Sequence, residues 1–92
     1  MIKTFRCKDT SQLFGGKGVV RWVHFRTVAE RKLQMLNRAT GLEDLRVPPN
    51  NRLELLKGER AGQFSIRIND QWRLCFRFEG GNAWDVEIVD YH

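Results

Sequence analysis

The fold can be predicted from residues 63–92, QFSIRINDQWRLCFRFEGGNAWDVEIVDYH. Three runs in this stretch alternate apolar and polar residues with a period of two, which is typical of strands that bury one face. Asn69-Asp70 and Gly80-Gly81-Asn82 separate the runs, and these residue types tolerate the backbone angles of tight turns. We therefore predict an antiparallel meander whose apolar face can carry a helix. Its three apolar rows are Phe64, Ile66 and Ile68; Trp72, Leu74, Phe76 and Phe78; and Trp84, Val86 and Ile88.

The opposite face of this meander is predicted to carry basic side chains. Arg67, Arg73 and Arg77 alternate with the apolar rows, and the chain ends on Asp90-Tyr91-His92. A guanidinium group forms paired hydrogen bonds with phosphate oxygens, and histidine exchanges protons near neutral pH. The pattern therefore indicates a phosphodiester substrate.

Length and composition limit the class of protein. A chain of 92 residues makes one domain, which we take as residues 1–92, and its net charge of +5 favours an acidic partner, nucleic acid first. A soluble basic protein without such a partner would carry the same charge. No apolar run approaches the length of a membrane span and no secretory leader occurs, so we expect no membrane contact.

The cysteines and histidines show no metal-binding spacing. Cys7 and Cys75 form no CxxC pair, and no histidine lies at zinc-ligand spacing, so we expect no metal and no cofactor. Cys75 is predicted to be a reduced, half-buried thiol. These features fit a cytoplasmic location.

The first 26 residues give weaker signals. Residues 2–6 alternate and are predicted to form an edge strand, and Asp9, Thr10 and Ser11 can cap a short helix that runs to Phe14. Residues 15–26 show no clean period, so a mobile loop and a helix entry both stay open. We interpret His24, in this segment, as structural or mobile.

A longer helix is predicted from Thr27, since Thr27 and Glu30 match a capping box. Its apolar stripe is Ala29, Leu33, Leu36 and Thr40, Gly41 is its expected C′ residue, and Glu30, Arg31, Lys32 and Arg38 are assigned to its solvated face. Residues 42–51 form a connector, residues 52–56 a short strand and residues 57–62 a turn. The predicted fold is α+β, with an antiparallel sheet of about five strands and two N-terminal helices packed on one face.

Short motifs along nearly the whole chain recur together in one family. They are Met1-Ile2-Lys3-x-Phe5, Leu56-Lys57-Gly58-x-Arg60-x-Gly62, Ser65-Ile66, Trp72-Arg73, Phe76-x-Phe78 and Asp90-Tyr91-His92. In this order they resemble the HigB-type toxins of the RelE/ParE superfamily of toxin–antitoxin modules. The GraT branch of that family is similar through residues 29–33, 51–54 and 69–76.

The resemblance implies a small endoribonuclease that cuts mRNA on the translating ribosome. A HigA-like antitoxin with a helix-turn-helix would hold it inactive, and operator DNA would be bound only through that antitoxin. The implied fold, a five-stranded antiparallel sheet with helices on one side, agrees with the fold predicted from the periodicity.

The resemblance also implies roles for the last three residues. Cleavage without a metal requires a group that deprotonates the 2′-hydroxyl and one that protonates the 5′-oxygen. His92 would transfer such a proton; alternatively it is a frayed end. Tyr91 stacks on a base, binds a phosphate or closes the edge of the core, and Asp90 orients His92, binds substrate or caps the strand. Strict alternation places Asp90 on the face of Ile88.

Basic residues would bind the RNA and its charged transition state. Arg73 suits the phosphorane, although a cross-strand charge pair with Asp85 or Glu87 is an alternative role. Lys57, assigned from the resemblance, would reach the scissile phosphate or assist the 2′-hydroxyl. We also expect RNA contacts from Arg52, Arg60, Arg67 and Arg77.

One position departs from the family pattern. Some HigB relatives carry a histidine in the strand before the Lys-Gly turn, where this chain has Glu54. A carboxylate can act as a base, but it repels phosphate. Two other functions remain open at this point: a ParE-like inhibitor of DNA gyrase that is not an enzyme, and a plain RNA-binding module.

Overall fold

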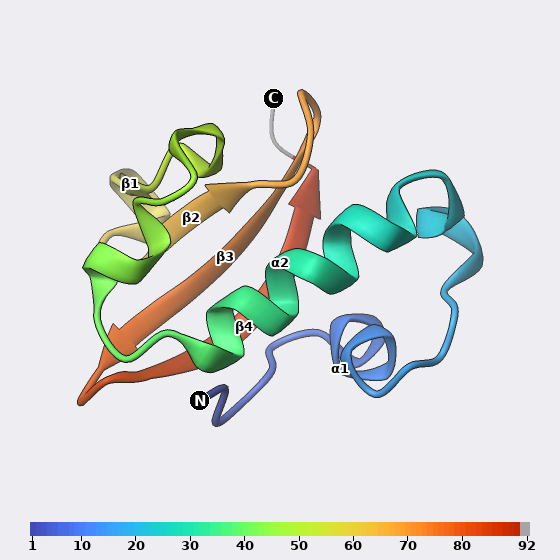
Figure 1. Cartoon of the computed structure of the whole chain (residues 1–92), viewed down its shortest axis with the longest axis horizontal. Coiled ribbons are helices and arrows are strands. Elements are labelled where there is room, and N and C mark those ends of the chain that lie inside the picture. The colour runs from blue at the N-terminus through green and yellow to red at the C-terminus, as the bar shows by residue number, and fades with distance from the viewer. Residues whose placement is uncertain (91–92) are drawn as a thin grey trace.

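A computed structural model describes residues 1–90, and its architecture is α+β (Figure 1). Two helices and four strands are joined by short 3-10 turns. The strands follow the order β1-β2-β3-β4 and every neighbouring pair is antiparallel. The elements are α1 (Lys8–Phe14), α2 (Arg26–Arg38), β1 (Glu54–Leu55), β2 (Phe64–Arg67), β3 (Trp72–Glu79) and β4 (Asn82–Asp90).

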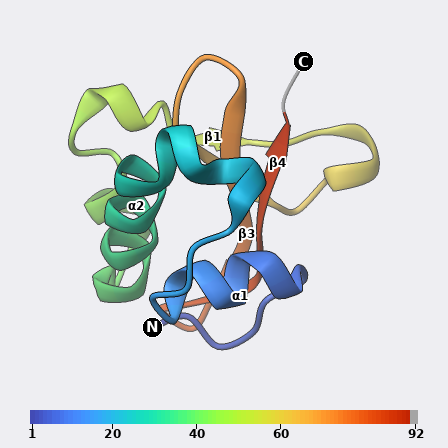
Figure 2. The same cartoon turned by 90° about the vertical axis from the view of Figure 1, so that its right-hand side faces the viewer.

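The helices form a layer over the apolar face of the sheet. Helix α2 runs roughly along the direction of β3 and β4, and α1 packs against α2 and lies across that direction (Figure 2). Thr10 is buried in α1, and its Oγ1 accepts a hydrogen bond of 3.0 Å from the backbone N–H of Ile88, which ties α1 to β4. The core of this layer contains Leu33, Leu36, Leu74 and others. The predicted fold class is therefore confirmed.

The strand count is smaller than predicted. Residues 2–6 do not form a continuous edge strand but make two isolated parallel bridges with β4, Ile2 to Ala83 and Phe5 to Val86. The ladder is interrupted because Asp85 lies between the bridges with a φ of +54°. Its N–H therefore turns to the side chain of Thr4, at 2.8 Å from Oγ1.

The predicted starts of both helices were wrong, as was the predicted end of the second, whereas the first helix ends at Phe14 as predicted. Helix α1 starts at Lys8 after Cys7, and α2 starts at Arg26 after Phe25, so Thr27 is not its N-cap. The preceding 3-10 turn, Val20–Phe25, buries Trp22 and Phe25. Packing of these two rings against Trp72 therefore sets where α2 begins. The helix ends at Arg38 with Ala39 as its C-cap, and Gly41 is extended.

The apolar rows of the meander are confirmed with one exception. Ile66, Leu74, Phe76 and Val86 are fully buried. The exception is Trp84, which is exposed, while its neighbour in sequence, Ala83, points into the core. The bulge at Asp85 reverses the alternation at this place.

The connector between α2 and β1 is fixed by a buried polar group. Asn51 accepts a hydrogen bond of 2.5 Å from Lys32 Nζ and donates one of 3.1 Å to the carbonyl of Leu45. Lys32 was predicted to be solvated but is buried, and burial, with Arg31 and Arg67 nearby, lowers its pKa. The two side chains together hold residues 45–51 against α2.

Candidate active site

Arg73 lies on the face of the sheet opposite the helices. It is only 6% exposed, on β3. Its Nε donates to Oγ of Ser65 at 2.8 Å, and its Nη2 donates to the carbonyl of Arg52 at 2.6 Å. Ser65 faces Cys75 across β2 and β3, so the register of these strands puts the hydroxyl beside the guanidinium group. The guanidinium group is therefore fixed from two sides.

Glu54 is the acidic neighbour of this guanidinium group. Its Oε1 lies 3.6 Å from Nη1 of Arg73, and the carboxylate is about half exposed. The register of β1 explains the contact, because Glu54 lies opposite Ser65. Arg73 thus pairs with Glu54, rather than with Asp85 or Glu87 as the alternative role proposed. A carboxylate and a guanidinium group therefore lie side by side at the position where some HigB toxins carry a histidine.

Three of the four arginines expected to bind RNA pair with carboxylates. Arg60 donates to Glu87 at 3.2 Å, Arg67 pairs with Asp70, and Arg77 donates to Glu79 at 3.1 Å. The Arg77–Glu79 pair is more than half exposed and Asp70 is almost fully exposed, whereas Glu87 is mostly buried. Exposed ion pairs contribute little free energy. A phosphate can therefore replace the carboxylate, although the attraction of the face for RNA is smaller than a count of arginines suggests.

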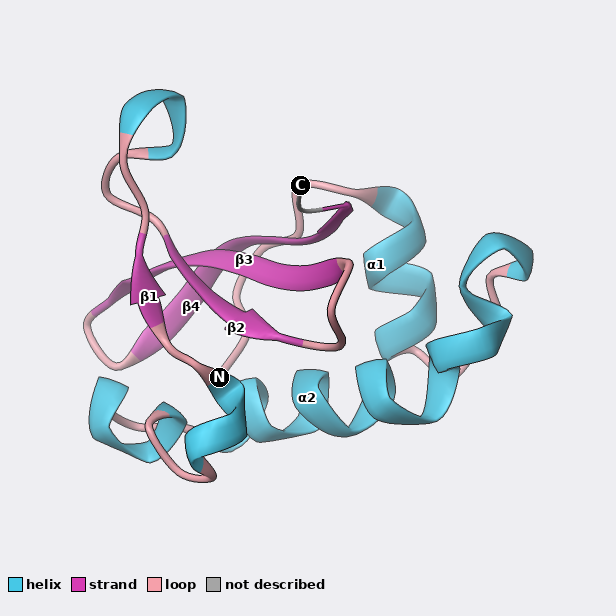
Figure 3. Ribbon diagram, turned by 90° about the horizontal axis from the view of Figure 1, so that it is seen from above, coloured by secondary structure: helices cyan, strands magenta, loops and turns pink. Residues whose placement is uncertain are grey.

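Arg52 and Lys57 have no ion pair within residues 1–90. Arg52 has a φ of +46° as the C-cap of the turn Pro49–Asn51, which aims its carbonyl at Arg73. Lys57 is exposed and precedes the 3-10 turn Gly58–Arg60, which projects from the end of β1 and β2 (Figure 3). Arg52 joins the site through its backbone, while Lys57 is free to reach a ligand over the same face.

The chain end is described only as far as Asp90. Asp90 lies opposite Trp72 in the register of β3 and β4, on the face of Ile88, as strict alternation predicted. Its Oδ2 accepts a hydrogen bond of 3.1 Å from Gln71. The structure therefore places this carboxylate on the other face from Arg73. Tyr91 and His92 lie outside the described residues.

Cys75 lies next to Arg73 on the same face, and it is buried. Burial raises the pKa of its thiol to about 11; Glu87 acts in the same direction, and Arg60 and Arg73 oppose it. The thiol is therefore protonated at neutral pH and is not a nucleophile.

This pKa predicts how stability changes at high pH. In the unfolded chain the thiol titrates near 9.0, so between pH 9 and 11 the folded chain holds the proton longer. The free energy of unfolding should then fall as the pH rises, by roughly 1–3 kcal/mol from this group. Urea unfolding at pH 8 and pH 11 should show a smaller loss for Cys75→Ala than for wild type. Cys7→Ala serves as the control, and equal losses in all three proteins would contradict the assignment.

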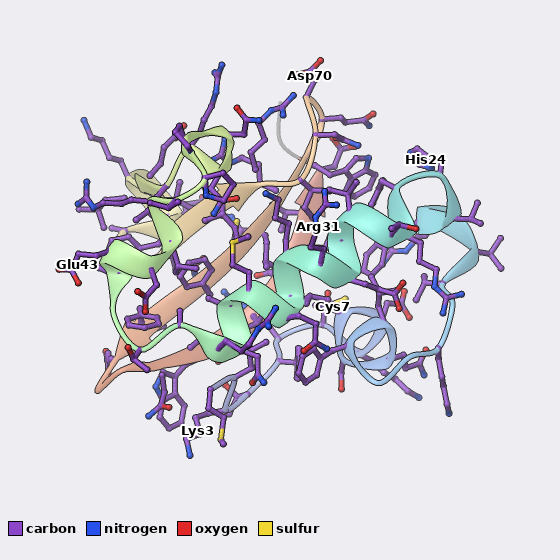
Figure 4. All side chains as sticks on the ribbon, viewed as in Figure 1. Lys3, Cys7, His24, Arg31, Glu43 and Asp70 are labelled. Atoms are coloured by element: carbon purple, nitrogen blue, oxygen red, sulfur yellow. The ribbon has the colours of Figure 1, made fainter. Side chains whose placement is uncertain are left out.

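Other features lie away from this face. A hollow of about 280 Å³, lined by Arg31, Met35, Arg38, Ala39 and Asp44, belongs to the helix layer. His24 is exposed at the far end of α2 (Figure 4). No helix of residues 1–90 is long and apolar enough to cross a membrane. In the same range no group of three His, Cys, Asp or Glu side chains could hold a metal ion.

Ser65 is the site residue that the sequence prediction missed as a contact of Arg73. The only feature of the sequence that could have pointed to Ser65 is its small polar side chain in a strand of large side chains. The partnership between Glu54 and Arg73 was also missed, because it depends on the pairing of β1, β2 and β3.

Comparisons with known proteins agree on one family. A family model described as "RelE-like toxin of type II toxin-antitoxin system HigB" matches residues 4–92. Endoribonuclease HigB of Proteus vulgaris is 36% identical over 94 aligned positions, which cover both chains in full. Toxin HigB-1 of Vibrio cholerae serotype O1 is 49% identical over 58 residues, which span 63% of this chain and 61% of that protein.

Two solved structures share the fold at low sequence identity. YafQ from Escherichia coli BL21(DE3) superposes with a TM-score of 0.63 at 12% identity, covering 98% of this chain and 93% of YafQ. A chain of the heterotetrameric YoeB-YefM toxin-antitoxin complex from Staphylococcus aureus superposes with a TM-score of 0.60 at 17% identity, covering 100% and 98%. At these identities the likeness shows the fold alone.

Proposed function

Since the chain belongs to the HigB-like family of RelE-like toxins of type II toxin–antitoxin systems, we propose that it is an endoribonuclease that cuts mRNA on translating ribosomes. The observation that carries the proposal is the fixed guanidinium group of Arg73 beside the carboxylate of Glu54. A relative that covers the whole chain bears the name endoribonuclease.

Arg73 and Glu54 would divide the chemistry between them. Glu54 takes the proton of the 2′-hydroxyl, and the 2′-oxygen attacks the phosphorus. The bond to the 5′-oxygen then breaks, which leaves a 2′,3′-cyclic phosphate. Arg73 binds the phosphoryl oxygens, whose charge grows in the transition state, and it offsets the repulsion between phosphate and Glu54. Because Ser65 and the Arg52 carbonyl hold Arg73 in place, little reorganisation is needed during the reaction.

Lys57 and the chain end complete the proposed site. Lys57 contacts the scissile phosphate from the projecting turn. His92 protonates the 5′-oxygen, and Tyr91 orients His92 or contacts the RNA. Asp90, whose carboxylate lies on the other face of the sheet from Arg73, would orient His92 from the end of β4. These roles are supported by the family resemblance of the motifs. The arginines at positions 52, 60, 67 and 77 contact flanking phosphates.

The partner that restrains the toxin is an antitoxin, and we propose that it is HigA-like, with a helix-turn-helix that binds the operator. The family is defined by toxin–antitoxin pairs. We place the protein in the cytoplasm, because its proposed substrate is mRNA on ribosomes.

Growth and RNA mapping test the proposed function together. Brief expression should arrest growth, and co-expression of the helix-turn-helix protein from the neighbouring reading frame should restore it. New mRNA 5′ ends should appear within minutes, and they should disappear when translation initiation is blocked beforehand. Arrest with intact mRNA and relaxed DNA would instead indicate a gyrase inhibitor. Normal growth at confirmed expression would exclude a toxin.

A further inference from the structure

Strand β4 turns a tryptophan out of the core by means of a bulge. Cys75 pairs with Glu87 and Arg77 pairs with Trp84, so two residues of β4, Asp85 and Val86, lie opposite Phe76 alone. Such a bulge re-aims the side chains beside it and is common next to active sites. Without it, alternation with Val86 would place Trp84 in the core.

The bulge is stabilised by specific hydrogen bonds from the N-terminal segment. Asp85 adopts a left-handed φ of +54°, which a residue other than glycine rarely takes. Thr4 supports it with three contacts: its Oγ1 accepts from the N–H of Asp85 at 2.8 Å and donates to Oδ1 of Asp85 at 3.5 Å, and its carbonyl accepts from the N–H of Val86 at 3.1 Å. The exposed position of Trp84 therefore depends on three segments of the chain: the N-terminal segment that contains Thr4, β3 and β4.

Trp84 shares the open face with Arg73. It is the cross-strand partner of Arg77, and its side chain belongs to the row that contains Arg73, Cys75 and Arg77. The residue is 36% exposed. Its Nε1 donates to the carbonyl of Glu79 at 3.4 Å, which orients the indole and leaves no polar group for a partner to satisfy. An oriented apolar ring is thus available beside an arginine.

The distance between Trp84 and the proposed site suits a bound strand of RNA. Arg77 follows Arg73 by four positions in β3, which corresponds to about 13 Å along the strand. This span covers about two to four nucleotides, depending on how far the RNA is stacked, since stacked bases rise about 3.4 Å each. A base near the cut could therefore reach the indole.

We propose that Trp84 stacks on an unpaired base of the RNA, about two to four nucleotides from the cleaved bond. This assignment rests on the proposed function. An RNA base is the fitting occupant because aromatic rings bind unpaired bases by stacking, and because the neighbouring Arg77 attracts the phosphate of the same nucleotide. The surface is also continuous with Arg73, so one strand can contact both.

A scan with abasic nucleotides tests the assignment. Ribosome-bound mRNAs would each carry one abasic nucleotide within five positions of the cut. For wild type, cleavage should fall about 5- to 140-fold at one position, which is the stacking energy of a base converted to a rate ratio. On intact mRNA, Trp84→Ala should cleave more slowly by the same factor. An abasic nucleotide at the sensitive position should not lower the cleavage rate of this variant further. Trp84→Phe should recover much of the rate, and Val20→Ala, at an exposed apolar residue of the helix layer, should cut normally.

Each other result has a defined meaning. Normal cleavage by Trp84→Ala, or wild-type cleavage that ignores every abasic nucleotide, overturns the assignment alone. Loss of neutralisation by the antitoxin with unchanged cleavage also overturns it, because Trp84 would then contact protein. Absence of cleavage by wild type overturns the proposed function and this assignment with it. If Trp84→Ala does not fold, Trp84→Phe and the wild-type scan decide.

Discussion

Replacing Arg73 by alanine should lower the rate of mRNA cleavage about 100- to 1,000-fold, the usual loss when one preorganised donor to a charged transition state is removed. The guanidinium group is nearly buried and fixed by Ser65 and Arg52, so water cannot easily take its place. Arg73→Lys should restore only a small part of the rate, because an ammonium group cannot make the same two fixed contacts. The measurement is the rate at which 5′ ends appear on ribosome-bound mRNA.

Folding must be checked in the same experiment. Removing Arg73 leaves Ser65 Oγ and the Arg52 carbonyl without this donor, which costs about 1–3 kcal/mol of stability. Circular dichroism and antitoxin binding would show whether the variant is folded. Arg38→Ala, on the helix layer, is the matched control for loss of one positive charge. A folded Arg73→Ala protein that cuts at the wild-type rate would remove Arg73 from the mechanism.

Deleting His92 should lower cleavage about 100- to 10,000-fold, as expected for loss of a general acid or base. His92 lies outside the described residues, so this prediction rests on the family resemblance and on the chemistry of its imidazole. A change at a single residue that packs against no buried feature usually alters stability by no more than about 0.5 kcal/mol, and this is what we expect for His92. The melting temperature and antitoxin binding should therefore stay unchanged while toxicity disappears.

Three proteins give a clear test of the chain end: wild type, His92→Gln and a chain that ends at Tyr91. A tag fused after His92 should also weaken cleavage more than a tag before Met1. If the truncated chain cuts as fast as wild type, the role of general acid must pass to Lys57 or Tyr91, or Glu54 must return the proton that it took as the base.

Much of the sheet could be predicted because side chains alternate with a period of two wherever one face is buried. Ile66, Leu74 and Phe76 followed this rule. The rule failed at Trp84, because the bulge depends on Thr4, which is eighty residues away in the sequence. The same holds for α2, whose start is set by the packing of Trp22 and Phe25 on Trp72 rather than by a local cap.

The candidate site could be predicted only in part. Arg73 could be identified because it alternates with the apolar residues of a strand that carries a second arginine, Arg77, on the same face. Its contacts could not be predicted, since they come from the carbonyl of Arg52 and from side chains on two other strands. The ion pairs of Arg60 and Arg77 with Glu87 and Glu79 likewise depend on pairing and turn geometry, and they change a basic face into a mostly balanced one.

The buried contact between Lys32 and Asn51 has a consequence for anyone who recombines these toxins. Asn51 immediately precedes Arg52, whose carbonyl holds Arg73, so the helix layer and the reaction centre share one continuous support. Consider a chimera that receives residues 42–52 from this chain while its α2 comes from another toxin that has no lysine at position 32. Such a chimera would lack the ammonium group that holds Asn51. Lys32, the connector and Arg73 must therefore be transferred as one block.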